Sequence, residues 1–414
     1  MSPDAAPYVY LNVTNVKLTM NPILWLLAFG AGMTAANAYY AQPLLADIAT
    51  AFHATSAAAG LVTMATQLGF AAGLVLIVPL ADSHDRRRII LGATAGGTLA
   101  LVAVALAPSL PFLVLASVFL GFLTVTPQLS VAYAATLADD RTRGRAIGRV
   151  VSGLLVGILL SRAVSGVLGA RIGWRGPFFV AAAATSLLLA VFARYLPSQL
   201  PPRKVPYGQL LASLPRLVVE LAPLRRHAVL GALVMGAFSV FWTTLTFRLA
   251  APPLHHGSGV AGLLSLLGVA GALAAPLAGR LTDRHGARWV NGDGIAVVAL
   301  AYAVFAAAGH TLIGLGAGIV LLDSGIQGNH VSNQTRVLSL DAALRNRLNT
   351  LYMVSFFTGG AFGSALGAWT WSLWGWAGVT TCGATFGVLG LVAFAFLPDT
   401  SPLARGARSE RQRP

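Results

Sequence analysis

The chain has 414 residues, of which 56% are hydrophobic and only 10% are charged, and its mean hydropathy is +0.73. A water-facing surface needs roughly 25% charged residues, so this composition excludes a soluble globular protein. The formal net charge of +15 comes from Lys and Arg residues scattered over many short segments, whereas a nucleic-acid-binding protein gathers them on one face.

Apolar stretches of about 20 residues follow one another along the chain, each long enough to cross roughly 30 Å of hydrocarbon as a helix. Lipid admits only helices or closed barrels, and the alternating ten-residue segments of a barrel are missing. We therefore predict an all-α membrane protein. Its twelve transmembrane helices are expected at residues 22–45, 55–80, 89–107, 111–137, 146–169, 175–196, 226–251, 258–280, 289–308, 311–335, 348–371 and 375–397.

The spans divide into six and six. Residues 22–196 and 226–397 are predicted to form two helical bundles, and residues 197–225 the linker between them. The linker holds five prolines: Pro197, Pro201, Pro202, Pro206 and Pro215. Residues 1–21 and 398–414 are expected to be terminal segments outside the bundles. The first of these has no apolar core, so we expect no cleaved signal peptide, and Met20 is an alternative start to Met1.

The two halves repeat one another. A shift of 202 residues places Tyr39-Tyr40 on Phe241-Trp242, and Gly173-Trp174 on Gly375-Trp376. Two halves of the same direction are parallel repeats about an axis along the membrane normal. The sequence thus predicts two pseudo-symmetric six-helix bundles.

The positive charges predict the orientation. Of the 28 Lys and Arg residues, 24 fall on the side that holds both termini and the linker. Because Lys and Arg accumulate on the cytoplasmic side of a membrane protein, we expect both termini and the linker to be cytoplasmic.

Two equivalent loops on that side carry an aspartate and a basic cluster. They run from Pro79 to Arg88 and from Gly279 to Arg288. An aspartate at a helix end can pair with an arginine across a bundle interface and so hold one conformation. Plain cytoplasmic charge would explain the arginines, but neither the aspartates nor their repetition. We name as the latch residues Asp82, Arg86, Arg87, Asp283, Arg284 and Arg288.

The fifth span combines small residues with a cation. Gly153, Gly157 and neighbouring small residues at spacings of four predict close packing against another helix. Packing alone would account for them. It does not account for Arg162, because a mid-span cation costs several kcal/mol unless it meets a partner or water.

The tenth span is the most polar, and Asp323 is the only acid that the pattern places well inside a span. A carboxylate in a low dielectric holds its proton more tightly than in water, so it can load and release a proton as a cavity changes its exposure. We predict that Asp323 and Arg162 take part in proton coupling. A structural hydrogen bond from Asp323 to a neighbouring helix is the alternative.

Aromatic and amide side chains on the first, fourth, seventh and tenth spans suit a site for an amphipathic organic molecule. Each could also be an interfacial or packing residue. The candidates for the substrate cavity are Asn37, Tyr39, Tyr40, Gln42, Gln128, Trp242, Gln327, Asn333 and Gln334.

Several motifs resemble a known family. They are the loop from Gly279 to Arg288, the stretch from Asn37 to Leu45, Gly173-Trp174-Arg175, Asp323 with Asn333-Gln334, and the stretch from Arg345 to Thr350. Together these resemble bacterial major facilitator superfamily proteins of the drug:proton antiporter-like branch, over nearly the whole chain. The resemblance implies a monomer in the bacterial cytoplasmic membrane that exports a drug, sugar or metabolite in exchange for protons by alternating access.

Signatures of enzymes are missing from the sequence, since it has no phosphate-cradling loop, no H-E-x-x-H pattern and no pair of cysteines. We therefore expect a transporter without cofactor or metal, whose partners are a small-molecule substrate, protons and the lipid bilayer, but not nucleic acid. Import or facilitated diffusion of a small solute on the same fold is the first alternative. A non-transporting membrane sensor is the second.

Overall fold

The computed structural model describes residues 13–139, 141–200, 206–341 and 344–397, and within them the side chains of residues 13–21 and of a few others, including Asp283, are left out. All regular structure in these ranges is helical, which confirms the all-α prediction. The α-helices are α1 (Val13–Ala36), α2 (Leu45–Ala51), α3 (Ser56–Leu76), α4 (Arg86–Ala105), α5 (Leu110–Leu123), α6 (Thr126–Leu137), α7 (Arg143–Ile172), α8 (Gly176–Tyr195), α9 (Tyr207–Glu220), α10 (Ala222–Ala250), α11 (Ser258–Ser265), α12 (Val269–His285), α13 (Ala287–Ala308), α14 (Leu312–Ser339) and α15 (Arg345–Phe396). Short 3₁₀ helices are η1 (Gln42–Leu44), η2 (Val78–Asp82) and η3 (Leu266–Gly268).

Eight helices in the described part of the chain are long and apolar enough to cross a membrane. Several predicted spans differ in detail from a single straight helix. The fourth is divided into α5 and α6, because Pro127 lacks the N–H that would continue the helix, and the eighth is divided into α11, η3 and α12. The last two spans are joined in α15 at Gly375, whose φ of 58° suits glycine, so the structure is consistent with twelve crossings.

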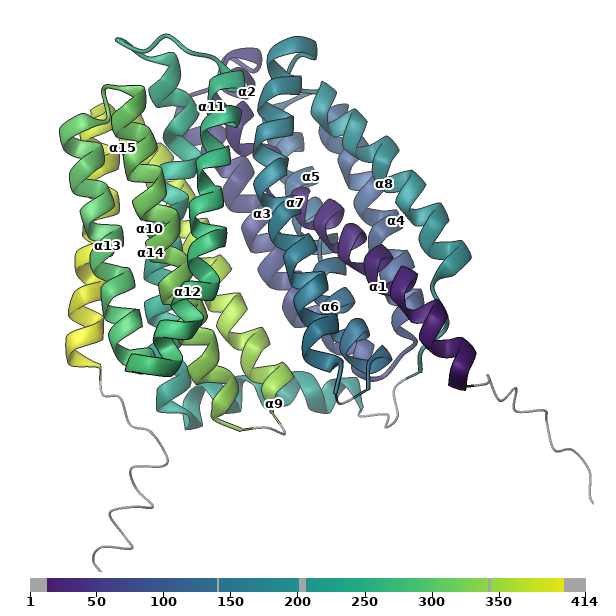
Figure 1. The fold of residues 1–414 in the computed structure, drawn as a ribbon. Coiled ribbons are helices and arrows are strands. Elements are labelled where there is room, and N and C mark those ends of the chain that lie inside the picture. The colour runs from purple at the N-terminus through teal and green to yellow at the C-terminus, as the bar shows by residue number, and fades with distance from the viewer. Residues whose placement is uncertain (1–12, 140, 201–205, 342–343, 398–414) are drawn as a thin grey trace, which may run out of the picture.

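The two halves stand side by side, with α1–α8 in one and α10–α15 in the other (Figure 1). Helix α9 lies across one end of the molecule, here called the linker end; the opposite end, where α2 and α11 lie, is called the far end. Sequence reasoning expected only a connector at residues 197–225. Helix α9 forms there because Leu210, Leu214 and Leu217 recur at helical spacing and are buried on one face.

The halves pack closely at the far end. Gly166 of α7 faces Gly262 of α11 so closely that a Cβ at Gly166 would lie 2.8 Å from the Gly262 Cα. The Ala46 N–H of α2 donates a 3.0 Å hydrogen bond to Thr246 Oγ1 of α10. These contacts join the halves through glycines and short polar groups rather than through bulky side chains.

Helices α3 and α15 join the halves along a second line. The rings of Phe70 and Phe357 meet edge to face with centroids 4.5 Å apart, and Gln67 Nε2 donates to Ser364 Oγ at 3.0 Å. At the linker end, α9 packs against η2 and α15. Extended packing of α6 against α12 is not found among the described residues, so the space between the halves is closed most firmly at the far end.

Candidate functional site

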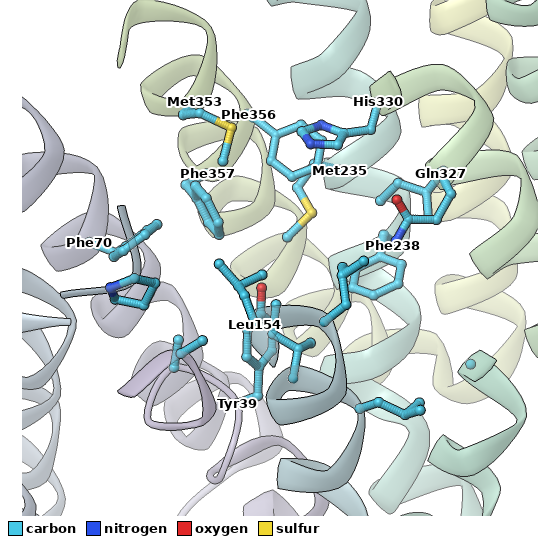
Figure 2. A pocket seen from close by; sticks show the side chains of 18 of the residues that line it. Tyr39, Phe70, Leu154, Met235, Phe238, Gln327, His330, Met353, Phe356 and Phe357 are labelled. Atoms are coloured by element: carbon cyan, nitrogen blue, oxygen red, sulfur yellow. The ribbon is translucent and has the colours of Figure 1, made fainter. Parts of the chain in front are cut away.

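A cavity of about 180 Å³ lies between the two halves. Its walls come from α1, α3, α6 and α7 of the first half and from α10, α14 and α15 of the second. Figure 2 shows Tyr39 at one end of this cavity, and His330 and Phe356 at the other. A site between pseudo-symmetric halves is where a transporter of parallel repeats binds its substrate.

Most of the lining is aromatic, aliphatic or thioether. Phe70, Phe238 and Phe357 present rings to the cavity, and Met235 and Met353 add flexible side chains with polarisable sulfur (Figure 2). Such walls bind apolar bodies, while the few polar groups among them orient the ligand.

Arg162 is held in a cage of aromatic rings. Its guanidinium carbon lies 4.4 Å from the ring centroid of Trp242, 4.7 Å from Tyr39 and 5.4 Å from Phe238. Its Nε donates to Gln42 Oε1 at 2.6 Å, whereas its Nη2 has no hydrogen-bond partner in the described structure. Cation–π contacts stabilise a desolvated guanidinium by about 2 kcal/mol or more each, which explains how this arginine remains inside the bundle at 4% exposure.

Asp323 lies on α14 facing Arg162 across the cavity. The carboxylate interacts electrostatically with Arg162 and faces the indole of Trp242. Neither contact reaches hydrogen-bond or ion-pair geometry in the described structure, and Oδ2 of Asp323 and Nε1 of Trp242 are both left without a partner. Gly271 allows α12 to approach here, since a Cβ at that position would lie 2.9 Å from the Asp323 Cβ.

The structure brings together some of the predicted cavity residues. Tyr39, Gln128 and Gln327 line the cavity together with Arg162 and Asp323. Gln42 and Trp242 lie behind the lining and hold Arg162.

The other four predicted cavity residues lie elsewhere. Asn37 is buried, and its Oδ1 has no described partner. Tyr40 packs edge to face on Phe178, with centroids 6.4 Å apart. Gln334 donates to Asn349 Oδ1 at 2.9 Å.

Asn333 belongs to a ring of three amides within the second half. Asn291 donates to Asn333 at 2.6 Å, Asn333 to Asn329 at 3.0 Å, and Asn329 back to Asn291 at 3.3 Å. His227 Nδ1 lies 2.7 Å from Asn333 Oδ1. Since these amides satisfy one another, Asn333 joins α10, α13 and α14 rather than facing the cavity.

His330 is a cavity residue that sequence reasoning did not select. Its Nδ1 lies 3.0 Å from the Tyr352 hydroxyl, and its ring packs on Phe356 with centroids 4.7 Å apart. The sequence does contain a pattern that could have found His330. Asp323, Gln327 and His330 stand at positions i, i+4 and i+7 and so share one helix face.

The latch residues of the first half lie at the linker end. Asp82 and Arg86 form an i,i+4 ion pair at 3.8 Å, and Asp82 also interacts electrostatically with Arg347 of the other half. The Arg87 guanidinium instead donates to the Ala193 carbonyl at 2.5 Å within its own half.

In the second half, Arg284 and Arg288 are exposed on α12 and α13, and the Asp283 side chain lies outside the described residues.

Comparison with known proteins identifies the class of protein that this fold and central cavity define. The family model of the Major Facilitator Superfamily matches residues 25–344 and 228–414. The chain belongs to the major facilitator superfamily and is a multi-pass membrane transporter of small solutes.

Individual relatives agree with this assignment. The chain is 38% identical over 372 residues to the putative uncharacterized transporter YgaY of Escherichia coli (strain K12), covering 90% of this chain and 94% of that protein. It is 30% identical over 278 residues to the chloramphenicol resistance protein of Streptomyces lividans, covering 64% and 68%. Its fold is similar to the crystal structure of a bacterial homolog of the human lysosomal transporter Spinster in an inward-facing and occupied conformation, with a TM-score of 0.75 and 16% identity over 91% of this chain and 96% of that chain.

Proposed function

We propose that this protein exports a small organic molecule in exchange for protons by alternating access, as a monomer in the bacterial cytoplasmic membrane. The observation that carries the proposal is the position of Asp323. Among the described residues that line the cavity it is the only acid, and it faces a buried cation without a direct ion pair. Ionisable groups inside a membrane bundle are costly and by default functional.

The packing of the halves supports alternating access. Glycine-mediated contacts close the far end, while α6 and α12 make no extended contact at the linker end among the described residues. With 24 of 28 Lys and Arg residues on the linker side, we assign that end to the cytoplasm and the conformation to the inward-facing state. Residues 22–196 and 226–397 are then the two bodies that rock about the cavity.

Asp323 supplies a physical basis for coupling. When the carboxylate is ionised, it balances the charge of Arg162 across the cavity; when it is protonated, Arg162 is left as an uncompensated cation. A substrate that contacts both groups binds the two protonation states with different affinities. That difference in affinity is the coupling free energy between proton and substrate.

Export is favoured over import by one relative, whose name is chloramphenicol resistance protein. Chloramphenicol is therefore the first transport probe. Import and facilitated diffusion use the same cavity and are separated from export by the direction of proton-driven movement.

The test is accumulation of labelled chloramphenicol in everted membrane vesicles that contain the full chain, with an acid interior. We expect accumulation that disappears when an uncoupler collapses the proton gradient. Accumulation that survives the uncoupler, or proton-driven accumulation only in right-side-out vesicles, would contradict proton-coupled export.

A further inference from the structure

The far-end side of the cavity presents two opposite charges to the same space. Arg162 and Asp323 both line it, on α7 of one half and α14 of the other. A cationic ligand group at this place would be repelled by the guanidinium of Arg162, and an anionic group would be repelled by the carboxylate of Asp323. Full charges of either sign are therefore disfavoured, because desolvated like charges repel strongly in a low dielectric.

Unpartnered polar atoms surround these two groups. Arg162 Nη2, Gln42 Nε2 and Trp242 Nε1 are donors without a described acceptor, and Asp323 Oδ2 is an acceptor without a donor. All four side chains are at least nine-tenths buried, with exposures between 1% and 8%. Leaving such groups unsatisfied is costly, so the site favours a ligand group that both donates and accepts.

The guanidinium does not need a full negative charge. Three aromatic rings and Gln42 already stabilise it. A neutral acceptor such as a hydroxyl oxygen is sufficient for the remaining N–H groups, and its own hydrogen can be donated to Asp323.

The rest of the cavity sets the size and nature of the ligand body. Its volume of about 180 Å³ is slightly larger than the roughly 150 Å³ cavity that holds one benzene molecule. Phe70, Phe238 and Phe357 offer ring faces and edges to an aromatic body.

We propose that the substrate class is a neutral, single-ring aromatic compound with a hydroxyl group, bound so that the hydroxyl donates to Asp323 and accepts from Arg162. This inference rests on the proposed function and names its substrate. It also explains the exchange. The ionised carboxylate accepts the hydroxyl hydrogen in a charge-assisted hydrogen bond, whereas a protonated Asp323 accepts it only as a neutral and weaker partner, so protonation weakens substrate binding and proton and substrate compete.

Binding to the purified full chain tests this directly. Isothermal titration in detergent, with a blank of empty micelles, compares four aromatic probes of matched size: 4-ethylphenol, its donor-free isomer 4-methylanisole, the anion phenylacetate and the cation phenethylamine. We expect 4-ethylphenol to bind at least about tenfold more tightly than each of the other probes. Only its neutral hydroxyl can donate a hydrogen bond to the charged Asp323 carboxylate while accepting one from Arg162.

Variants locate the selectivity. In Asp323→Asn the preference for 4-ethylphenol over 4-methylanisole should fall about tenfold. Trp242→Phe, which keeps the ring but removes the indole N–H, should reduce it less. The matched control is Asp293→Asn, because Asp293 is exposed on α13 and does not line the cavity. This variant should prefer 4-ethylphenol over 4-methylanisole as strongly as the unaltered protein does.

The outcomes separate the two proposals. Tighter binding of phenylacetate or phenethylamine, equal binding of all probes, or binding of none of them would overturn the hydroxyl assignment and leave proton-coupled export standing on its vesicle test. Hydroxyl-selective binding together with uncoupler-insensitive transport would support the substrate class and overturn proton coupling.

Discussion

The contact between Gly166 and α11 provides a sharp test of the conformational cycle. A Cβ added at Gly166 would lie 2.5 Å from the Ser258 carbonyl oxygen and 2.8 Å from the Gly262 Cα. Both are backbone atoms of the other half, so no side-chain rotation relieves the clash. Overpacking of this kind costs about 1–3 kcal/mol.

This cost falls on the conformation that is closed at the far end. Gly166→Ala should therefore shift the equilibrium toward the state that is open there by roughly 5-fold to 150-fold. Gly148→Ala is the matched control, because Gly148 lies on the same helix and a Cβ there has nothing within 4 Å. Both changes alter intrinsic helix propensity equally, so the difference between them reports the contact alone.

Pulsed electron paramagnetic resonance measures the shift. Spin labels at Ser109 and His310, which are exposed at the far end of the first and second halves, give the separation of the halves in a Cys382→Ser background. We expect a population at longer distance in Gly166→Ala and not in Gly148→Ala. Indistinguishable distance distributions for the two variants would refute the reasoning.

Three further predictions concern the linker end. Single cysteines at positions 256 and 284 should react with an impermeant reagent from opposite sides of the membrane, and reaction from the same side would contradict the topology. Asp82→Asn combined with Asp283→Asn should reduce turnover more than expression, as measured by transport per amount of purified protein, and unchanged turnover would remove the latch role. Burial raises the pKa of Asp85, but hydrogen bonds from Ser198 and from the backbone of Gln199 and Arg87 outweigh it and hold the pKa below its usual value. A lowered pKa stabilises the folded state above the unfolded-state pKa of about 4, and this contribution is lost as pH falls through the native pKa. Thermal unfolding should thus show Asp85→Asn less stable than the unaltered chain at pH 7, with the difference shrinking toward pH 3; an equal difference at both values would contradict this.

The sequence predicted the fold well because lipid leaves so few choices. Apolar length alone located the spans, and the repeat placed the two halves. Two details were out of reach. Residues 207–220 read as a proline-containing connector, yet α9 forms because its leucines find apolar partners at the linker end. The second is the division of the eighth span at η3, where Gly268 and Gly271 lie against Asp323 of α14.

The site was predictable in its charges but not in its contacts. Arg162 and Asp323 stood out because charges are rare within spans. Spacing along the sequence could not show that Trp242 and Tyr39 enclose Arg162, because Tyr39 lies in the turn after α1 and Trp242 on α10 of the other half. Asn333 was predicted to line the cavity because polar residues are also rare within spans. Its hydrogen bonds to Asn291 and Asn329 instead place it in the amide ring.

The central claim is that Asp323 carries the coupled proton, and one comparison in proteoliposomes tests it. Asp323→Asn should abolish accumulation driven by a proton gradient while retaining exchange of labelled for unlabelled substrate, and Asp293→Asn should retain both. Gradient-driven accumulation by Asp323→Asn with unchanged pH dependence would show that the proton is carried elsewhere and would contradict the account.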